Sequence, residues 1–183
     1  MSTTKLGRAG NLLGALSLSV ADRTSDAVGD AAGQSQTAAI ALSALDQFLD
    51  DPSVDMLRRV LGLTPSGAVR LVDRLEDAGH VTRGPGADGR SVSVRLTASG
   101  RRAARRVTAA RGEVLESALS TLSTREREQF EEMLSRVLPG LMRGPGATRW
   151  MCRLCDMEAC GRDEGRCPVA NAARERFAGP DRP

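Results

Sequence analysis

Residues 57–103 have the sequence LRRVLGLTPSGAVRLVDRLEDAGHVTRGPGADGRSVSVRLTASGRRA, and the fold can be predicted from the elements that they form. Two short helical segments flank a tight turn in which Gly62 ends the first helix and Thr64 caps the second. Pro65 then occupies the first helical position, where proline is well tolerated. The β-type runs VTR and SVSVRL follow, and GPGADGR between them predicts a hairpin. Helix, turn, helix and hairpin in this order predict a winged helix-turn-helix.

Helices are also predicted before this stretch. Residues 11–30 carry small and apolar side chains at helical spacing and predict one long amphipathic helix. Its apolar face has few large side chains, so it is better suited to packing against a partner chain than to forming a core. Residues 37–50 predict a second helix, ended by Asp-Asp-Pro, and Ser53 caps a short helix over residues 54–62.

Two further helices are predicted after the hairpin. Thr97 caps a long helix over residues 97–122, and Ser123 with Glu126 forms a capping box that opens the next, over residues 123–142. The breaker Gly-Pro-Gly at residues 144–146 separates this helix from a segment that holds all four cysteines. The predicted fold class is therefore mainly α with a small β-hairpin.

Composition narrows the classes of function. Only 2% of the 183 residues are aromatic and none is Tyr, which argues against a stacking platform for single-stranded nucleic acid. No apolar run approaches the ~20 residues of a membrane span, and residues 12–20 make a poor signal peptide. We therefore expect a cytoplasmic protein without a membrane partner. The net charge of +3 is mildly basic and allows an anionic partner.

Residues 57–103 resemble the DNA-binding core of the MarR family. The resemblance is densest in TPSGAVRLVDRLEDAG and DGRSVSVRLTASG, and weaker motifs extend it over about residues 10–142. It implies a MarR-like interleaved homodimer in which each protomer contributes one winged helix. On this basis we divide the chain into a dimerisation helix (1–36), a DNA-binding domain (37–98), two dimerisation helices (99–143) and a four-cysteine appendage (144–183).

The helix over residues 65–78 suits the major groove of DNA. Its apolar residues recur at helical spacing and form a stripe that can anchor it. The candidate DNA-binding residues lie at its start or on its other side: Thr64, Ser66, Gly67, Arg70 and Arg74. Ser66 and Gly67 permit close approach, and Arg70 can reach a guanine edge or a phosphate. Two solvated helix charges are the alternative interpretation of Arg70 and Arg74, and the winged-helix context favours DNA contact.

The tip of the predicted hairpin carries two further candidates, Asp88 and Arg90, on either side of Gly89. An arginine on a thin ribbon suits a narrow minor groove, where the phosphates focus negative potential. The two residues match the Asp-x-Arg wing motif of the MarR family. The resemblance implies that Arg90 enters the minor groove and that Asp88 orients it. Ser91 and Arg83 are weaker candidates for phosphate contact.

Little in the sequence favours an enzyme. His80 is the only histidine, and it has no evident nucleophile or acid partner. We expect it to pack at the base of the wing or to lie in solvent. The carboxylates lie mostly on predicted helix surfaces, and no glycine loop for phosphate binding is present. The basic run over residues 101–111 is expected to be a solvated helix face.

The four cysteines have the spacing C-x2-C-x4-C-x6-C-P and are Cys152, Cys155, Cys160 and Cys167. Disulfides are the least favoured interpretation, because the expected compartment is reducing. A structural zinc ion is a second interpretation, although four-cysteine zinc sites commonly use two C-x2-C pairs and only one is present. An iron–sulfur cluster is favoured, because such sites use cysteine-only ligation, uneven gaps and a last ligand followed by proline. The segment also loosely resembles the cluster loop of redox-sensing regulators of the unrelated MerR class.

Other residues of the appendage have expected roles. Arg153, Arg162 and Arg166 are expected to offset the charge of a thiolate cluster or to reach the DNA backbone. Trp150, the only tryptophan, is expected to pack the appendage onto the dimer.

Together these features predict a dimeric, sequence-specific transcription regulator, expected to be a repressor. Its partner would be double-stranded DNA with a pseudo-palindromic operator, whose half-sites lie about one helical turn, ~10 bp, apart. The cysteine site would sense redox or metal state. One alternative is a regulator that responds to a small aromatic anion and holds a purely structural zinc ion. Another is an electron-carrying or metal-storing protein in which the helix-turn-helix only mediates assembly.

Overall fold

The computed structural model describes residues 6–86 and 91–177, which are mainly helical with one two-stranded antiparallel sheet. The helices before the wing are α1 (Arg8–Ala32), α2 (Gln36–Gln47), α3 (Val54–Leu61) and α4 (Pro65–Asp77). The wing is formed by β1 (Val81–Pro85) and β2 (Val92–Leu96). After it come α5 (Ala98–Leu119), α6 (Thr124–Val137), the 3₁₀ helix η1 (Leu138–Leu141), α7 (Ala147–Met151), α8 (Met157–Cys160) and α9 (Pro168–Phe177). The order confirms the predicted winged helix-turn-helix between flanking helices.

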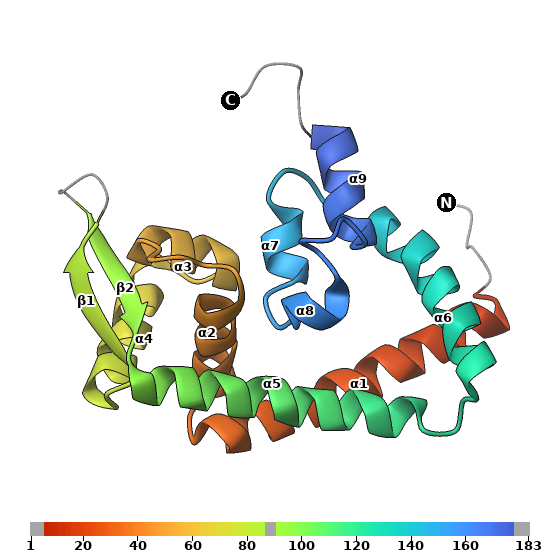
Figure 1. The fold of residues 1–183 in the computed structure, drawn as a ribbon, viewed down its shortest axis with the longest axis horizontal. Coiled ribbons are helices and arrows are strands. Elements are labelled where there is room, and N and C mark those ends of the chain that lie inside the picture. Colours follow the sequence, from red (N-terminus) through yellow and green to blue (C-terminus); the bar gives the residue numbers. More distant parts are fainter. Residues whose placement is uncertain (1–5, 87–90, 178–183) are drawn as a thin grey trace.

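The two long helices α1 and α5 lie side by side and form the base of the molecule (Figure 1). The winged helix, made of α2, α3, α4 and the hairpin, stands at one end of this base, and α6 stands at the other. The segment α7–α9 lies between them, on the same side of α5 (Figure 1). In this position the segment α7–α9 can contact both the winged helix and α6.

Hydroxyl side chains begin the helices at the predicted places. The hydroxyl of Ser53 accepts a hydrogen bond from Met56 N at 3.1 Å and starts α3. Thr97 starts α5 in the same way, with Gly100 N donating at 3.0 Å. Ser123 and Glu126 form the predicted capping box at the start of α6. Each cap satisfies amide groups that have no partner within the helix, which explains why these starts could be located from the sequence.

The core lies beneath the winged helix and extends to α1 and α5. The predicted apolar stripe of α4 is inside it, with Ala68, Leu71, Val72 and Leu75 all at most 1% exposed. Val28 of α1 and Val107 of α5 are fully buried in the same core. Burying each such side chain stabilises the fold by roughly 1.5–3 kcal/mol. Helix α4 is therefore anchored in the core along the whole of its inner side.

The wing is an antiparallel hairpin with Val81 opposite Leu96 and Pro85 opposite Val92. The chain just before α3 adds to it, because Val94 N donates to the carbonyl of Pro52 at 2.9 Å. At the base of the hairpin, the carbonyl of His80 accepts a hydrogen bond from Thr97 N at 3.0 Å. The position predicted for His80, at the base of the wing, is thus confirmed.

The helix limits differ in places from the sequence prediction. Helix α2 ends at Gln47, three residues early, and α6 ends at Val137 instead of continuing to residue 142. Pro139 has no amide proton to donate, so the chain tightens into η1 there. The short helices α7, α8 and α9 after the Gly-Pro-Gly breaker were not predicted. Among the described residues no helix is both long and apolar enough to cross a membrane.

Candidate nucleic-acid interface and cysteine cluster

The outer side of α4 displays the predicted DNA-binding residues. Thr64, Ser66, Arg70 and Arg74 are exposed and Gly67 is half-buried, whereas the opposite side of the helix is in the core. Thr64 caps the helix by accepting a hydrogen bond from Gly67 N at 3.1 Å. A Cβ atom on Gly67 would lie 3.0 Å from the Thr64 hydroxyl oxygen. Glycine at this position therefore also protects the helix cap, a role that was not predicted from the sequence.

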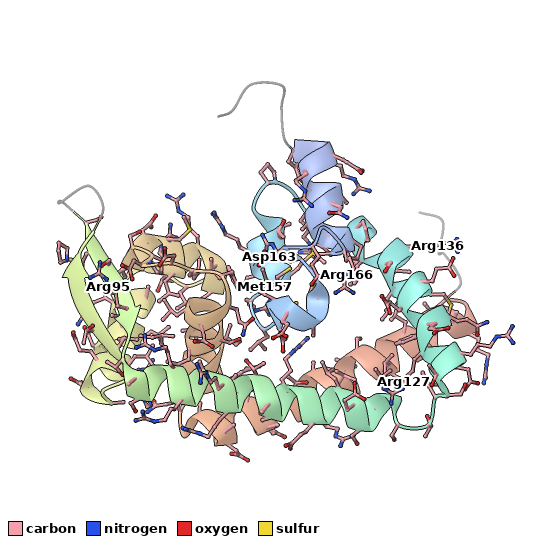
Figure 2. The ribbon with its side chains drawn as sticks, in the orientation of Figure 1. Arg95, Arg127, Arg136, Met157, Asp163 and Arg166 are labelled. Carbon is pink, nitrogen blue, oxygen red and sulfur yellow. The ribbon has the colours of Figure 1, made fainter. Side chains whose placement is uncertain are left out.

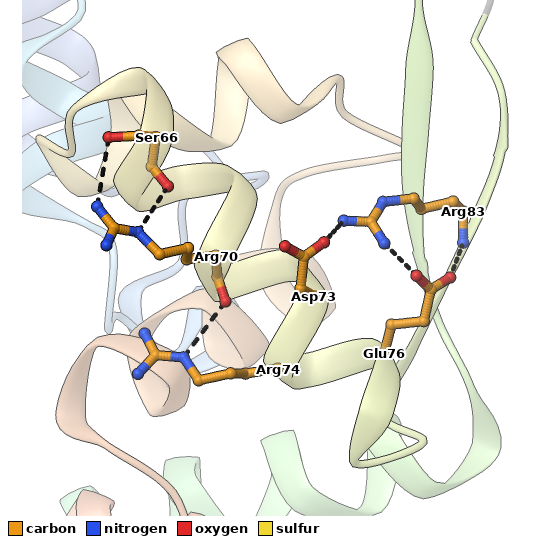
Figure 3. A network of polar contacts seen from close by, with 6 residues as sticks. All are labelled: Ser66, Arg70, Asp73, Arg74, Glu76 and Arg83. Carbon is orange, nitrogen blue, oxygen red and sulfur yellow. Dashed lines mark hydrogen bonds and ion pairs between the residues drawn. The ribbon is translucent and has the colours of Figure 1, made fainter.

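The two arginines of this surface are held along the helix axis (Figure 3). Arg70 Nε donates to the carbonyl of Ser66 at 3.3 Å, and Arg74 Nε donates to the carbonyl of Arg70 at 3.3 Å. Within the described part of the chain, neither guanidinium group forms an ion pair with a carboxylate. Their positive charge thus remains available to an anion on this side of the protein.

A cavity of about 500 Å³ lies against the same helix. Its walls combine apolar side chains with the guanidinium groups of the outer side. The lining residues are Thr37, Leu63, Gly67, Arg70, Leu71, Asp73 and Arg74.

Arg83 of β1 has a different role from the predicted phosphate contact. Its guanidinium group pairs with both Asp73 and Glu76 of α4, and its backbone amide donates to Glu76 Oε1 at 3.2 Å (Figure 3). Burial alone would lower the pKa of Arg83, but the two carboxylates outweigh this effect and raise the pKa. These ion pairs connect the wing to α4. Because they neutralise the charge of Arg83, this residue is not available to a phosphate.

The wing tip candidates Asp88 and Arg90 lie outside the described residues. Their assignment to the minor groove stays a prediction from the wing motif. Arg95 of β2, labelled in Figure 2, is among the described residues, and its Nε lies 2.6 Å from Asp51 Oδ2. This ion pair joins the wing to the chain that leads into α3.

All four cysteines have free thiols and gather in the segment α7–α9. Cys152 and Cys167 are buried, and Cys155 and Cys160 are half-buried. They interact as two pairs, Cys152 with Cys155 and Cys160 with Cys167, and each pair also acts electrostatically on the other. The fold thus brings together thiols that are up to fifteen residues apart in the sequence.

The pKa values of three cysteines in the cluster are shifted from that of an ordinary thiol, in different directions. A hydrogen bond to Cys155, with burial added, raises the pKa of Cys152 well above that of an ordinary thiol. The reciprocal hydrogen bond, opposed by burial and assisted by the positive charges of Arg111 and Arg162, lowers the pKa of Cys155 to about 6. Burial and a hydrogen bond with Cys167 raise the pKa of Cys160 to about 12. A thiolate is therefore favoured at Cys155 at neutral pH.

The charge of Arg162 acts on three of the four thiols. Its charge lowers the pKa of Cys152, Cys155 and Cys160, and its Nη1 is buried without a hydrogen-bond partner among the described residues. An unpaired buried donor costs roughly 1–3 kcal/mol, and more when it is charged. A negatively charged centre at the thiols would remove this cost. The charge and the donor set of the segment thus fit a metal bound by thiolates.

The thiols do not form a ready-made metal site. Within residues 6–86 and 91–177, no group of three or more His, Cys, Asp or Glu side chains has the geometry to hold a metal ion. The two cysteine pairs would have to draw closer to share one centre.

The other predicted arginines of the segment point elsewhere. The guanidinium carbon of Arg153 lies 3.9 Å from the centroid of the Trp150 ring. Arg166, labelled in Figure 2, pairs with Glu164 at 2.6 Å. Of the three arginines expected to offset a thiolate cluster, Arg162 is thus the one whose charge acts on the thiols.

Trp150 packs against another part of the same chain. Its ring lies over Gly62, in the turn between α3 and α4, where an added Cβ would be 2.9 Å from the ring carbon Cζ3. Trp150 thus packs the appendage onto the helix-turn-helix of its own chain, and the expected packing onto a dimer stays a prediction. Nothing in the sequence near Trp150 points to this target, because Gly62 is 88 residues away along the chain.

Known proteins resemble this architecture. The model of the MarR family matches residues 12–91. RV1404 from Mycobacterium tuberculosis has a TM-score of 0.64 at 20% identity, with 78% of this chain and 100% of that one covered. MepR from Staphylococcus aureus, described as a transcription regulator of the multidrug efflux pump MepA, has a TM-score of 0.62 at 19% identity, with 74% and 99% covered.

The MarR family protein Rv2887 from Mycobacterium tuberculosis, solved in complex with DNA, is 26% identical with a TM-score of 0.58, and 72% of this chain and 98% of that one are covered. Among curated proteins no sequence matches the chain. The three solved structures are covered almost completely, yet at least a fifth of this chain has no counterpart in any of them. The match to the family model ends before the first cysteine. Residues 12–91 of this chain are therefore similar to the MarR family, and the fold is that of solved winged-helix proteins of this kind.

Proposed function

We propose that the protein is a dimeric regulator that binds double-stranded DNA in a sequence-specific manner and acts as a repressor. The observation that carries the proposal is the outer side of α4, where Arg70 and Arg74 stand beside a hydroxyl-bearing helix start with no carboxylate partner in the described chain. A recognition helix needs such a side to enter a major groove. Rv2887, whose solved complex contains DNA, supports this use of the fold.

In this proposal the residues divide into two groups. Thr64, Ser66, Gly67 and Arg70 face base edges and nearby phosphates from the start of α4, and Arg74 holds a phosphate farther along. At the wing, Arg90 enters the minor groove and Asp88 orients it, as the family motif implies.

The homodimer is supported by apolar side chains that a single chain leaves exposed. Leu12, Leu13 and Leu16 of α1 and Met133 and Val137 of α6 are each between 44% and 53% exposed. The start of α1 and the helix α6 lie at the same end of the molecule, away from the winged helix (Figure 1). A second copy packed there would bury this surface and place two recognition helices on one face of the DNA.

DNA binding is tested by selecting genomic fragments and measuring mobility shifts at near-physiological salt. We expect a pseudo-palindromic site, with Arg70→Ala losing about 1–3 kcal/mol of binding free energy, about 5–150-fold in affinity, together with base preference. Arg90→Ala should weaken binding to all sequences and reduce its salt dependence. Arg125→Ala on α6 removes the same charge far from the winged helix and serves as the control. Unchanged affinity in both test variants would refute the assignment.

We further propose that Cys152, Cys155, Cys160 and Cys167 hold one metal centre, with an iron–sulfur cluster favoured over zinc. The support is the convergence of four free thiols and the buried, unpartnered Nη1 of Arg162. The two cysteine pairs would close around the centre, and Arg162 would balance part of its negative charge. An iron–sulfur cluster would supply one-electron redox chemistry, whereas zinc would stabilise the segment outright.

Metal analysis tests this second proposal. The protein is purified without oxygen, its visible absorption is recorded, and iron, sulfide and zinc are measured. A brown protein with iron and sulfide supports the cluster, and a colourless protein with about one zinc per chain supports the structural alternative. Replacing Cys155 by Ser should abolish binding in either case. A protein free of all three elements would refute the site.

A small aromatic anion is an alternative signal for the same DNA-binding function. The cavity beside α4 offers Arg70 and Arg74 to a carboxylate and Leu63 and Leu71 to a ring. Rv2887 has also been solved in complex with salicylic acid, at 26% identity and a TM-score of 0.56, with 74% of this chain and 99% of that one covered. Salicylate should then release DNA from this protein in a mobility-shift titration, and no release at millimolar salicylate would exclude this signal.

A further inference from the structure

The cysteine segment is docked on the helix-turn-helix by four contacts. The Trp150 ring covers Gly62, and Arg149 Nη1 lies 3.5 Å from Met56 Sδ of α3. Leu154 packs against the core beneath the winged helix. Met157 N donates to Gln47 Oε1, at the end of α2, at 2.8 Å. Met157, labelled in Figure 2, lies on the side of the segment that faces the winged helix.

All four contacts cluster around the first cysteine pair. Trp150 comes two residues before Cys152, Leu154 lies between Cys152 and Cys155, and Met157 comes two residues after Cys155. A centre that fixes this pair must also fix the backbone carrying the docking side chains. The opposite pair, Cys160 and Cys167, lies in a small separate core with Val169 and Ala170.

The target of the docking is the turn that positions the recognition helix. Gly62 ends α3 in the left-handed conformation, with φ of +65°, and Thr64 caps α4 two residues later. The Trp150 ring closes over Gly62 so tightly that an added methyl group would touch it. A side chain that packs on this turn therefore restrains the orientation of α4 relative to α3.

Resting on the metal centre and DNA binding proposed above, we infer that the cysteine segment is a metal-dependent clamp on the helix-turn-helix. With the centre bound, the segment is ordered and Trp150 holds the turn in one geometry. Without the centre, the first cysteine pair and its docking residues become more mobile. The turn then adopts more conformations, and DNA binding must restrict them. Because ordering a loop on binding costs affinity, the metal-bound form binds its operator more tightly. The expected difference is about 5–150-fold, the usual range for coupling between two sites.

Zinc ion is the probe for the test, and the full chain is used under anaerobic reducing conditions. Hydrogen exchange is followed over residues 54–67, which span α3, the turn and the start of α4, and residues 8–20 of α1 serve as the internal reference. Zinc should slow exchange over residues 54–67 and not over the reference. Trp150 is the only tryptophan, so its fluorescence reports the contact directly and should become less accessible to iodide when zinc binds.

Two aromatic variants separate the clamp from general stabilisation of the segment. Trp150→Ala removes the docking ring, and Phe177→Ala removes another partly exposed ring, in α9 of the same segment. Both should bind zinc with the wild-type stoichiometry. Zinc should slow exchange over residues 54–67 in the wild type and in Phe177→Ala, and should leave it unchanged in Trp150→Ala.

The outcomes distinguish this inference from the proposals on which it rests. Equal zinc-dependent protection in Trp150→Ala and wild type, or no protection in a wild type that binds zinc, overturns the clamp while the metal site stands. A wild type that binds no zinc and, when purified without oxygen, holds no iron and sulfide overturns the metal site and the clamp together. Zinc-dependent protection in a protein that binds no DNA supports the clamp and overturns the proposed function.

Discussion

Replacing Gly100 by alanine should destabilise the protein, although alanine is the better helix former. Gly100 is buried in the first turn of α5, and its amide donates to the Thr97 hydroxyl that caps the helix. A Cβ atom there would lie 2.0 Å from the carbonyl oxygen of His80 and 3.0 Å from Leu96 Cδ2. The carbonyl cannot move freely, because it already accepts hydrogen bonds from the Thr97 amide and hydroxyl. The base of the wing must therefore shift.

The magnitude follows from two opposing effects. Alanine gains about 0.5–1 kcal/mol over glycine inside a helix. Forcing an extra methyl group into packed backbone costs about 1–3 kcal/mol or more, and a lost hydrogen bond adds about 0.5–1.5 kcal/mol. The net expectation is a loss of about 1–3 kcal/mol in the free energy of unfolding. For a protein of this size, each kcal/mol lowers Tm by about 2–4 °C.

Thermal and urea unfolding at a fixed protein concentration measure this loss. Gly112→Ala is the matched control, because Gly112 lies in the same helix and an added Cβ would meet nothing within 4 Å. The control should keep the helix-forming gain and raise the stability by up to about 1 kcal/mol. The two variants should thus change Tm in opposite directions. A Gly100→Ala protein as stable as Gly112→Ala would refute the close approach of α5 to the wing.

Three further predictions concern the local structure of the winged helix and of α6. Thr64→Ala removes the cap that accepts the Gly67 amide and should cost about 0.5–2 kcal/mol of stability by urea unfolding, whereas Thr64→Ser should cost much less. Arg83→Gln breaks the ion pairs between β1 and α4 and should speed hydrogen exchange in the wing strands, with Arg83→Lys intermediate; equal exchange in all three proteins would contradict the role given to this arginine. Hydrogen bonds from the Ser123 side chain and backbone lower the pKa of Glu126 below its ordinary value, so the stabilisation is present above that ordinary pKa and is lost as pH falls through the lowered one. Glu126→Ala should therefore be less stable than the wild type at pH 7 and approach it in acid, and a gap that persists at the lowest pH would count against the capping box.

The recognition helix shows how much local sequence determines. A cap such as Thr64 satisfies an amide only three residues away, and the apolar stripe of α4 repeats within two turns. Such short-range chemistry is independent of the rest of the fold, so the start, the end and the buried side of this helix could all be predicted. The hairpin followed in the same way from its two β-type runs.

The role of Arg83 depended on tertiary structure. A lone arginine on a strand next to a DNA-binding helix suggests a phosphate contact. The structure brings it against Asp73 and Glu76, which neutralise it. Pairing across two elements depends on how closely the strand approaches the helix, and no local pattern encodes that distance.

The cysteine segment separates the two kinds of information most clearly. That four thiols share a short stretch can be seen in the sequence alone, because their spacing is visible in the chain. Its helices are only 4 to 10 residues long, and isolated helices below about 12 residues are marginal in water. They form because they pack, so neither their limits nor their partner could be predicted. The contact of Trp150 with Gly62, in contrast, follows from the folded structure, since contact between residues so far apart in sequence arises from packing of the whole fold.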